Sequence, residues 1–151
     1  MLIAVDTNVL IRYVNAAYPE HAVIKRKVDG LIAAGHEICL CNQVIHEYWT
    51  VCTRPLANNG MGFDVDRTYD QIQRILTGYN LLADTENLLY IWLDLCKKHQ
   101  VAGKNAHDAR IVACMKLNRV DQLITLNPTD FSRFTEITCI TPKEVTEDQN
   151  G

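Results

Sequence analysis

The 151-residue chain is 48% hydrophobic and 22% charged, the composition of an ordinary globular protein, and its length favours a single domain. No apolar run approaches the ~18 residues of a membrane-spanning helix, and no charged segment followed by an apolar one indicates a secretory signal. The net charge of −3 argues against a nucleic-acid partner at first sight. Four carboxylates gathered around a metal would leave the remaining surface slightly positive, however, so net charge does not identify the partner.

The expected elements of the first half alternate between apolar runs and helical patterns. In chain order they are a strand at residues 2–5, a helix at about 9–15, a helix from about 20 to a stop at Gly35, a strand at 38–41 and a helix at about 43–52. The first strand is a continuous apolar run, as in a buried parallel sheet, and it is followed directly by Asp6.

The second half continues the alternation. Its expected elements are a loop at 57–62, a helix beginning at Asp64 or Asp66, a strand at 80–83, a helix from a Thr85 cap to about Lys98, a helix from Asn105 onward, strands at 122–126 and 137–140, and a polar tail after Pro142. In the helix after Asp64, the residues expected to face the core are Tyr69, Ile72, Ile75 and Leu76. The alternation predicts βαβ units and a parallel sheet.

The six cysteines fall in predicted strands and helices, without a C-x-x-C pair: Cys39, Cys41, Cys52, Cys96, Cys114 and Cys139. This distribution is typical of reduced, buried thiols in the cytoplasm and argues against a disulfide framework or a zinc site.

Five polar side chains are expected at one edge of the sheet. Asp6 ends the first strand, Glu47 lies early in the helix after the second, and Asp108 lies in the first turn of the helix that leads to the fourth. Asn127 and Asp130 follow the fourth strand. Because crossover helices run antiparallel to the strands, all five reach the carboxyl edge, where open α/β sheets bind ligands. We therefore expect Asp6, Glu47 and Asp108 to surround one pocket.

Each acid also has a structural explanation. Asp6 is a good helix cap, Asp108 gains from the helix dipole, Glu47 could face solvent and Asp130 could cap a turn. These explanations fail for the cluster as a whole, because two carboxylates ~5 Å apart repel by ~3 kcal/mol at an effective dielectric near 20. Such a cluster predicts a hard divalent cation with oxygen ligands, for which Mg²⁺ or Mn²⁺ is best suited.

Other chemistries fit the chain poorly. His46-Glu47 lacks the second histidine of a zinc peptidase, and His107 is expected to point away from its neighbour Asp108 on the helix. There is no Walker A or G-x-S-x-G pattern. A phosphohydrolase of the haloacid-dehalogenase type would need an acid two residues after Asp6, where this chain has Asn8.

Four blocks of the chain resemble the PIN-domain nucleases, and among them most closely the VapC-like toxins of bacterial toxin–antitoxin pairs. The blocks are Ala4-Val5-Asp6-Thr7-Asn8-Val9-Leu10, Glu47 after the second strand, Asn105-Ala106-His107-Asp108-Ala109, and the stretch from Leu123 to Phe131. They occur in the family's order and cover essentially the whole chain. The resemblance implies a single domain over residues 1–151, folded as an α/β/α sandwich around a central parallel sheet of about five strands.

The resemblance also implies that Asp6, Glu47 and Asp108 hold the metal. Many members carry a fourth acid directly after the threonine of the fourth strand, whereas Leu126 and then Asn127 follow Thr125 here. Either Asn127 binds through water or Asp130 supplies the fourth acid.

The implied activity is Mg²⁺-dependent hydrolysis of RNA phosphodiester bonds, with Mn²⁺ able to substitute, by a homodimer that a cognate antitoxin silences. The main alternative is a degenerate PIN fold that binds RNA or protein without cleavage, and failure to bind Mg²⁺ would favour that alternative.

Overall fold

The computed structural model describes residues 1–142, so the polar tail after Pro142 lies outside the described residues. The predicted strands and helices are all present, with bounds that differ from expectation by a few residues. They are β1 (Leu2–Val5), α1 (Thr7–Val14), α2 (His21–Ala33), β2 (Glu37–Leu40), α3 (Asn42–Thr53), η1 (Leu56–Asn58), α4 (Val65–Gly78), β3 (Asn80–Leu81), α5 (Asn87–Lys98), α6 (Asn105–Leu117), β4 (Gln122–Ile124), η2 (Pro128–Phe131) and β5 (Thr138–Ile140), where η denotes a 3₁₀ helix.

The five strands form one sheet in the order β3-β2-β1-β4-β5, and every neighbouring pair is parallel. The chain builds outward from β1 through β2 to β3 and then returns to place β4 on the other side of β1. The strand order therefore reverses between β1 and β4. In an open α/β sheet this switch point leaves a crevice beyond the carboxyl ends of the strands, and ligands bind there.

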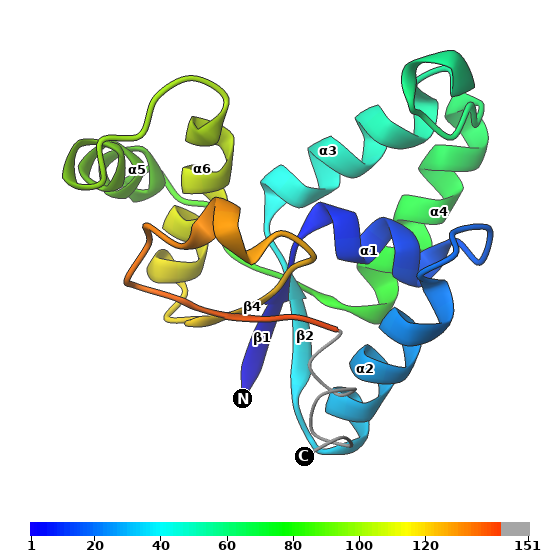
Figure 1. Ribbon diagram of the computed structural model, residues 1–151, viewed down its shortest axis with the longest axis horizontal. Helices are drawn as coiled ribbons and strands as arrows, with labels where there is room; N and C mark the ends of the chain where they lie inside the picture. Colours follow the sequence, from blue (N-terminus) through cyan, green and yellow to red (C-terminus); the bar gives the residue numbers. More distant parts are fainter. Residues whose placement is uncertain (143–151) are drawn as a thin grey trace.

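Helices cover both faces of the sheet (Figure 1). In Figure 1, α5 and α6 pack together on one side, whereas α1, α2 and α4 lie on the other. Helix α3 extends from the carboxyl edge and contacts α1, α4 and α6. The predicted α/β/α sandwich around a five-stranded parallel sheet is confirmed.

The core lies between the sheet and these helices because the central strands are apolar on both faces. Ile3, Ala4 and Val5 of β1 are all buried, as expected of a strand covered on both sides. Val112 and Met115 of α6 are fully buried in the same core. This packing fixes the directions in which the ends of β1 and β4 leave the sheet.

Two local predictions are wrong. Tyr69 is 55% exposed, because α4 buries a narrower stripe through Thr68, Ile72 and Ile75. Helix α5 has no side-chain cap from Thr85 and begins two residues later, at Asn87; only the Thr85 carbonyl takes part, accepting from the Leu88 amide.

Five cysteines are free thiols, as expected: Cys39, Cys41, Cys52, Cys96 and Cys114. All of these except the half-buried Cys96 are buried. No helix within residues 1–142 is long and apolar enough to cross a membrane.

Candidate metal and nucleic-acid site

A cleft of about 380 Å³ opens at the carboxyl edge of the sheet. Its walls include all five residues predicted for the site, namely Asp6, Glu47, Asp108, Asn127 and Asp130. The expectation that Asp6, Glu47 and Asp108 share one pocket is confirmed. The cleft lies at the switch point, since Asp6 follows β1 and Asn127 follows β4.

Asp6 is the most deeply placed of the acids, at 8% exposed. Its Oδ1 accepts the backbone N–H of Thr7 over 2.8 Å, and its Oδ2 accepts the hydroxyl of Thr125 over 2.8 Å. Asp6 is therefore both the cap of α1 and a wall of the cleft. Burial raises the pKa of Asp6, the two hydrogen bonds oppose that rise, and the charge of Asp130 adds to it.

Glu47 is held by the residue that follows Asp6. The hydroxyl of Thr7 donates to Glu47 Oε1 over 2.8 Å, so Thr7 bridges the two acids with its amide and its side chain. Burial raises the pKa of Glu47, the bond from Thr7 opposes the rise, and the charge of Asp6 contributes to it. Helix α3 thus brings Glu47 to the cleft from a segment 40 residues away.

Asp108 lies in the first turn of α6, as predicted. Burial raises its pKa to about 6, and the charges of Asp6, Asp130 and Glu47 act in the same direction. The helix dipole should favour an ionised acid at this position, so the raised pKa shows that burial and repulsion dominate. A cation in the cleft would relieve this repulsion.

Asn127 and Asp130 enter the cleft from the segment after β4. Asn127 precedes η2, and its backbone N–H donates to the Thr125 hydroxyl over 3.1 Å. Asp130 lies within η2, and its charge raises the pKa of both Asp6 and Asp108. Among these two candidates for the fourth acidic position, only Asp130 carries a charge that acts on the other acids.

Sequence reasoning missed several residues that line the cleft or hold its lining residues in place. Thr125 is fully buried and joins the ends of β1 and β4 through its bonds to Asp6 and Asn127. The signal was a lone hydroxyl residue within the apolar run of the fourth strand. Four further lining residues carried no recognisable motif: Arg12, Tyr18, Arg54 and Asn59.

His107 lines a different cleft from its neighbour Asp108, as expected. A neighbouring cleft of about 350 Å³ is lined by His107 together with Glu47 and Arg54. The charge of His107 lowers the pKa of both Glu47 and Asp108, although this effect is smaller than that of burial.

The oxygen-rich walls suit a hard cation. Within residues 1–142, no three acidic, histidine or cysteine side chains lie close enough together to hold a metal ion by themselves. Mg²⁺ does not need three such ligands, because it retains several waters and is commonly bound through one or two carboxylates together with substrate phosphates. Carboxylates that repel one another across a water-accessible cleft therefore fit Mg²⁺ or Mn²⁺ better than zinc, which prefers nitrogen and sulfur ligands.

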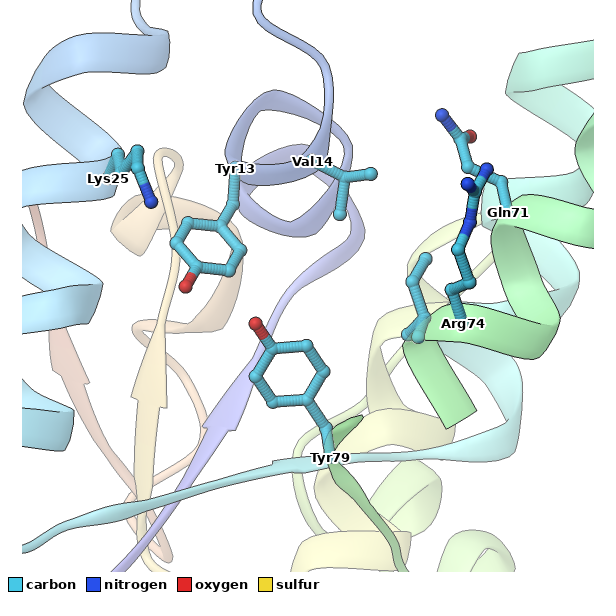
Figure 2. Close-up of a pocket in the computed structure, with 7 residues that line it drawn as sticks. Tyr13, Val14, Lys25, Gln71, Arg74 and Tyr79 are labelled. Atoms are coloured by element: carbon cyan, nitrogen blue, oxygen red, sulfur yellow. The ribbon is translucent and has the colours of Figure 1, made fainter. Parts of the chain in front are cut away.

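A second cavity, of about 410 Å³, lies among α1, α2 and α4 (Figure 2). The hydroxyls of Tyr13 and Tyr79 face each other there, with their rings edge-on and 6.2 Å apart. Lys25 and the Tyr13 hydroxyl are both engaged by Asp29, at 2.9 Å and 2.7 Å. None of the predicted site residues lines this cavity, so the acidic cleft is the candidate functional site.

The fold is a parallel α/β/α sandwich with an acidic cleft at its switch point. A comparison with protein-family models matches residues 3–137 to the PIN domain, and the chain belongs to this family. A comparison with the sequences of curated proteins finds no match.

Solved structures with the same fold include VapBC and VapC structures from several bacteria. Similarity to VapBC2 from Rickettsia felis, bound to a DNA fragment from the promoter, gives a TM-score of 0.71 at 13% identity, covering 93% of this chain and 98% of that one. VapBC-1 from nontypeable Haemophilus influenzae gives a TM-score of 0.66 at 19% identity, and the match covers 95% of this chain and 99% of that one. VapC20 from Mycobacterium tuberculosis, a sarcin–ricin loop cleaving toxin, gives a TM-score of 0.59 at 21% identity. That match covers 80% of this chain and 86% of that one. At these identities the similarity establishes a shared fold.

Proposed function

We propose that this protein is a metal-dependent ribonuclease that hydrolyses RNA phosphodiester bonds, as the VapC-like toxin of a toxin–antitoxin pair. The observation that carries the proposal is the convergence of four acids from separate segments on one cleft: Asp6, Glu47, Asp108 and Asp130. Membership of the PIN-domain family supports the same activity.

In this proposal Asp6, Glu47 and Asp108 would hold Mg²⁺ or Mn²⁺ together with waters that the ion retains. Asp130 would supply the fourth acid, and Asn127 would contribute a neutral oxygen through water. The bound metal supplies a more acidic water molecule and positive charge for the leaving oxygen. The chain's own contribution is orientation. Thr125 and Thr7 hold the Asp6 carboxylate from both oxygens, and Thr7 also fixes Glu47.

We further propose a cognate antitoxin as a partner, because VapBC-1 and VapBC2 are among the structures with this fold. Homodimer formation in the cytoplasm belongs to the same proposal. Large apolar side chains lie exposed on α5, at Leu89, Tyr90 and Leu93, and such side chains are typical of protein contact surfaces. Light scattering of the purified chain should give the mass of a dimer, and Leu93→Glu should return a monomer.

The decisive experiment is a cleavage time course on mixed RNA with and without Mg²⁺. Wild-type protein should cleave in Mg²⁺ or Mn²⁺ and be inactive in EDTA. A PIN-fold binding module without activity would instead bind RNA and leave it intact in both buffers.

A further inference from the structure

The acidic cleft has a cationic wall. Arg12 from α1 and Arg54 at the end of α3 line it alongside the acids. Both guanidiniums lie near Tyr18, and their charges oppose the effect of burial on the pKa of that phenol. Four carboxylates alone would repel a polyanionic substrate, so these two cations are the part of the cleft that attracts one.

Arg12 is held in a defined orientation. Its Nη1 donates to the Asn8 carbonyl over 2.9 Å, and its guanidinium lies 4.6 Å from the centroid of the Tyr18 ring. Glu20 forms an ion pair with Nε at 3.7 Å, a separation too long for a hydrogen bond. Within residues 1–142 the buried Nε has no hydrogen-bond partner, so the protein leaves the donor capacity of this side chain largely unused.

Arg54 is positioned by the loop that follows α3. Its Nη2 donates to the Asn59 carbonyl over 3.3 Å, while its Nε is also buried without a partner among the described residues. The loop folds back tightly at Gly60, where an added Cβ would lie 1.9 Å from the Arg54 carbonyl oxygen. Arg54 also lines the neighbouring cleft with Glu47, so it stands where the two clefts meet.

We propose that Arg12 and Arg54 form a clamp for an RNA phosphate adjacent to the one that is cleaved. Arginine suits this role because its planar guanidinium presents five donors and binds phosphate oxygens in pairs. Each side chain uses one Nη donor for a hydrogen bond to a backbone carbonyl that orients it. Since the Nε atoms are buried, the remaining Nη hydrogens are the donors available to a ligand. The acids then hold the metal at the reacting phosphate, and the clamp fixes the register of the strand.

This inference rests on the proposed function for its choice of ligand. An acidic segment of a partner protein has similar anionic groups, but it lacks the evenly spaced phosphates that would place one group on the metal and the next on the clamp. RNA is therefore the ligand that uses both walls of the cleft.

The test compares wild type with Arg54→Gln, Arg54→Lys and Arg12→Lys, and with Arg26→Gln on the exposed face of α2 as a matched control. Binding of a fluorescent single-stranded RNA is measured across a salt series, in EDTA and in Mg²⁺. An acidic peptide of equal length is titrated alongside. Cleavage kinetics and thermal melting accompany each variant.

Arg54→Gln should raise the Kd for RNA about tenfold and lower the slope of log K against log salt by about 0.7. Arg54→Lys should restore the salt slope and recover only part of the affinity, and in cleavage both variants should raise KM more than they lower kcat. Arg12→Lys should likewise keep the salt slope. Arg26→Gln should leave affinity and kinetics unchanged, and melting temperatures should match wild type throughout.

The clamp is refuted if Arg54→Gln binds RNA as wild type does, if Arg26→Gln weakens binding equally, if the acidic peptide binds more tightly than RNA, or if wild type binds no RNA in either buffer. Wild type that binds RNA through Arg54 but cleaves none would retain the clamp and reject the proposed ribonuclease. If Arg54→Gln instead cleaves RNA with an unchanged KM, the proposed ribonuclease is retained and the clamp is rejected.

Discussion

The hydroxyl of Thr125 donates to Asp6 Oδ2 over 2.8 Å, across 119 residues of sequence. This bond fastens the end of β4 to the end of β1, where the strand order reverses. Thr125 is fully buried, and its hydroxyl also accepts from the backbone N–H of Asn127. One side chain therefore positions residues on both sides of the crevice.

Thr125→Val should therefore destabilise the protein by about 1–3 kcal/mol at neutral pH, because it removes a bond to a charged group and leaves the Asn127 amide without its acceptor. The pKa of Asp6 should rise further, and Mg²⁺ should bind more weakly. Urea denaturation and a metal titration would check this. Thr125→Ser, which keeps the hydroxyl, serves as the control and should retain the wild-type affinity for Mg²⁺. Equal behaviour of the Val and Ser variants would mean that the bond is unimportant.

Asp6→Asn and Asp108→Asn should each abolish Mg²⁺-dependent RNA cleavage while preserving the fold. Each change keeps the shape of the side chain and removes a charge from a crowded set of carboxylates. The metal-free Asp108→Asn protein should therefore become more stable, whereas Asp6→Asn also loses the charged acceptor of the Thr125 hydroxyl, which offsets the gain. If Asp108 served only the helix dipole, its loss would instead cost about 0.3–1 kcal/mol. Cleavage assays and chemical denaturation of the same preparations separate the two cases. Full cleavage by either variant would show that the site has been misassigned.

The stability of the metal-free protein should depend on the ionisation of Asp108. Its pKa of about 6 in the folded protein lies above the ordinary 3.8, so the folded state binds this proton more tightly than the unfolded chain does. The stabilising contribution is complete below about pH 4 and is lost as the pH rises through about 6. After allowance for partial exposure, wild type should lose about 1–2 kcal/mol relative to Asp108→Asn between pH 4 and pH 7. Denaturation at a series of pH values measures the free energy of unfolding of both proteins. If it changes with pH in the same way for wild type and Asp108→Asn, the prediction is contradicted.

Mg²⁺ should stabilise the folded protein, since it binds a cluster that exists only after folding. At 100 times its dissociation constant it should add about 2.7 kcal/mol to the free energy of unfolding. Thermal melting with and without Mg²⁺ measures the effect. The Asp6→Asn and Asp108→Asn double variant is the control, and its melting temperature should not respond. An unchanged wild-type curve in millimolar Mg²⁺ would favour the binding module without activity.

The acids could be predicted from sequence because they follow from periodicity and topology. Apolar runs located the parallel strands, and crossover helices must then return their first turns to the carboxyl edge, which brings Asp108 to the same cleft as Asp6. Local turn chemistry could not separate Asn127 from Asp130, since both follow β4 within a few residues. Only the folded positions show that the charge of Asp130 acts on Asp6 and Asp108.

The cationic wall and the hydroxyl network could not be predicted in the same way. Arg12 and Arg54 belong to different helices and carry no spacing signal, and their proximity depends on how α1 and α3 pack. Tyr69 was misplaced for a related reason: a helical stripe in the sequence fixes which residues share a face, but tertiary packing fixes how wide the buried part of that face is.

Gly60→Ala should disturb the cleft from outside its acidic centre. A Cβ at Gly60 would lie 1.9 Å from the carbonyl oxygen and 2.4 Å from the carbonyl carbon of Arg54, and backbone atoms cannot rotate away as a side chain would. The loop must then lift from the end of α3 and strain the backbone bonds by which it is held, including those from Met61 to Val51 and from Gly62 to Arg54.

We expect Gly60→Ala to lose about 1–3 kcal/mol of stability, as overpacked sites do, and to weaken RNA binding because Arg54 and Asn59 move with the loop. Gly30→Ala is the matched control. Gly30 lies within α2 with nothing within 4 Å of an added Cβ, so alanine there should stabilise the helix by about 0.5–1 kcal/mol and leave RNA cleavage unchanged. Urea denaturation of both variants, with RNA affinity measured alongside, tests whether the free energy of unfolding falls in Gly60→Ala and rises in Gly30→Ala. A Gly60→Ala protein as stable as wild type would show that the loop relaxes at no cost and that its close approach to Arg54 is not what positions the guanidinium.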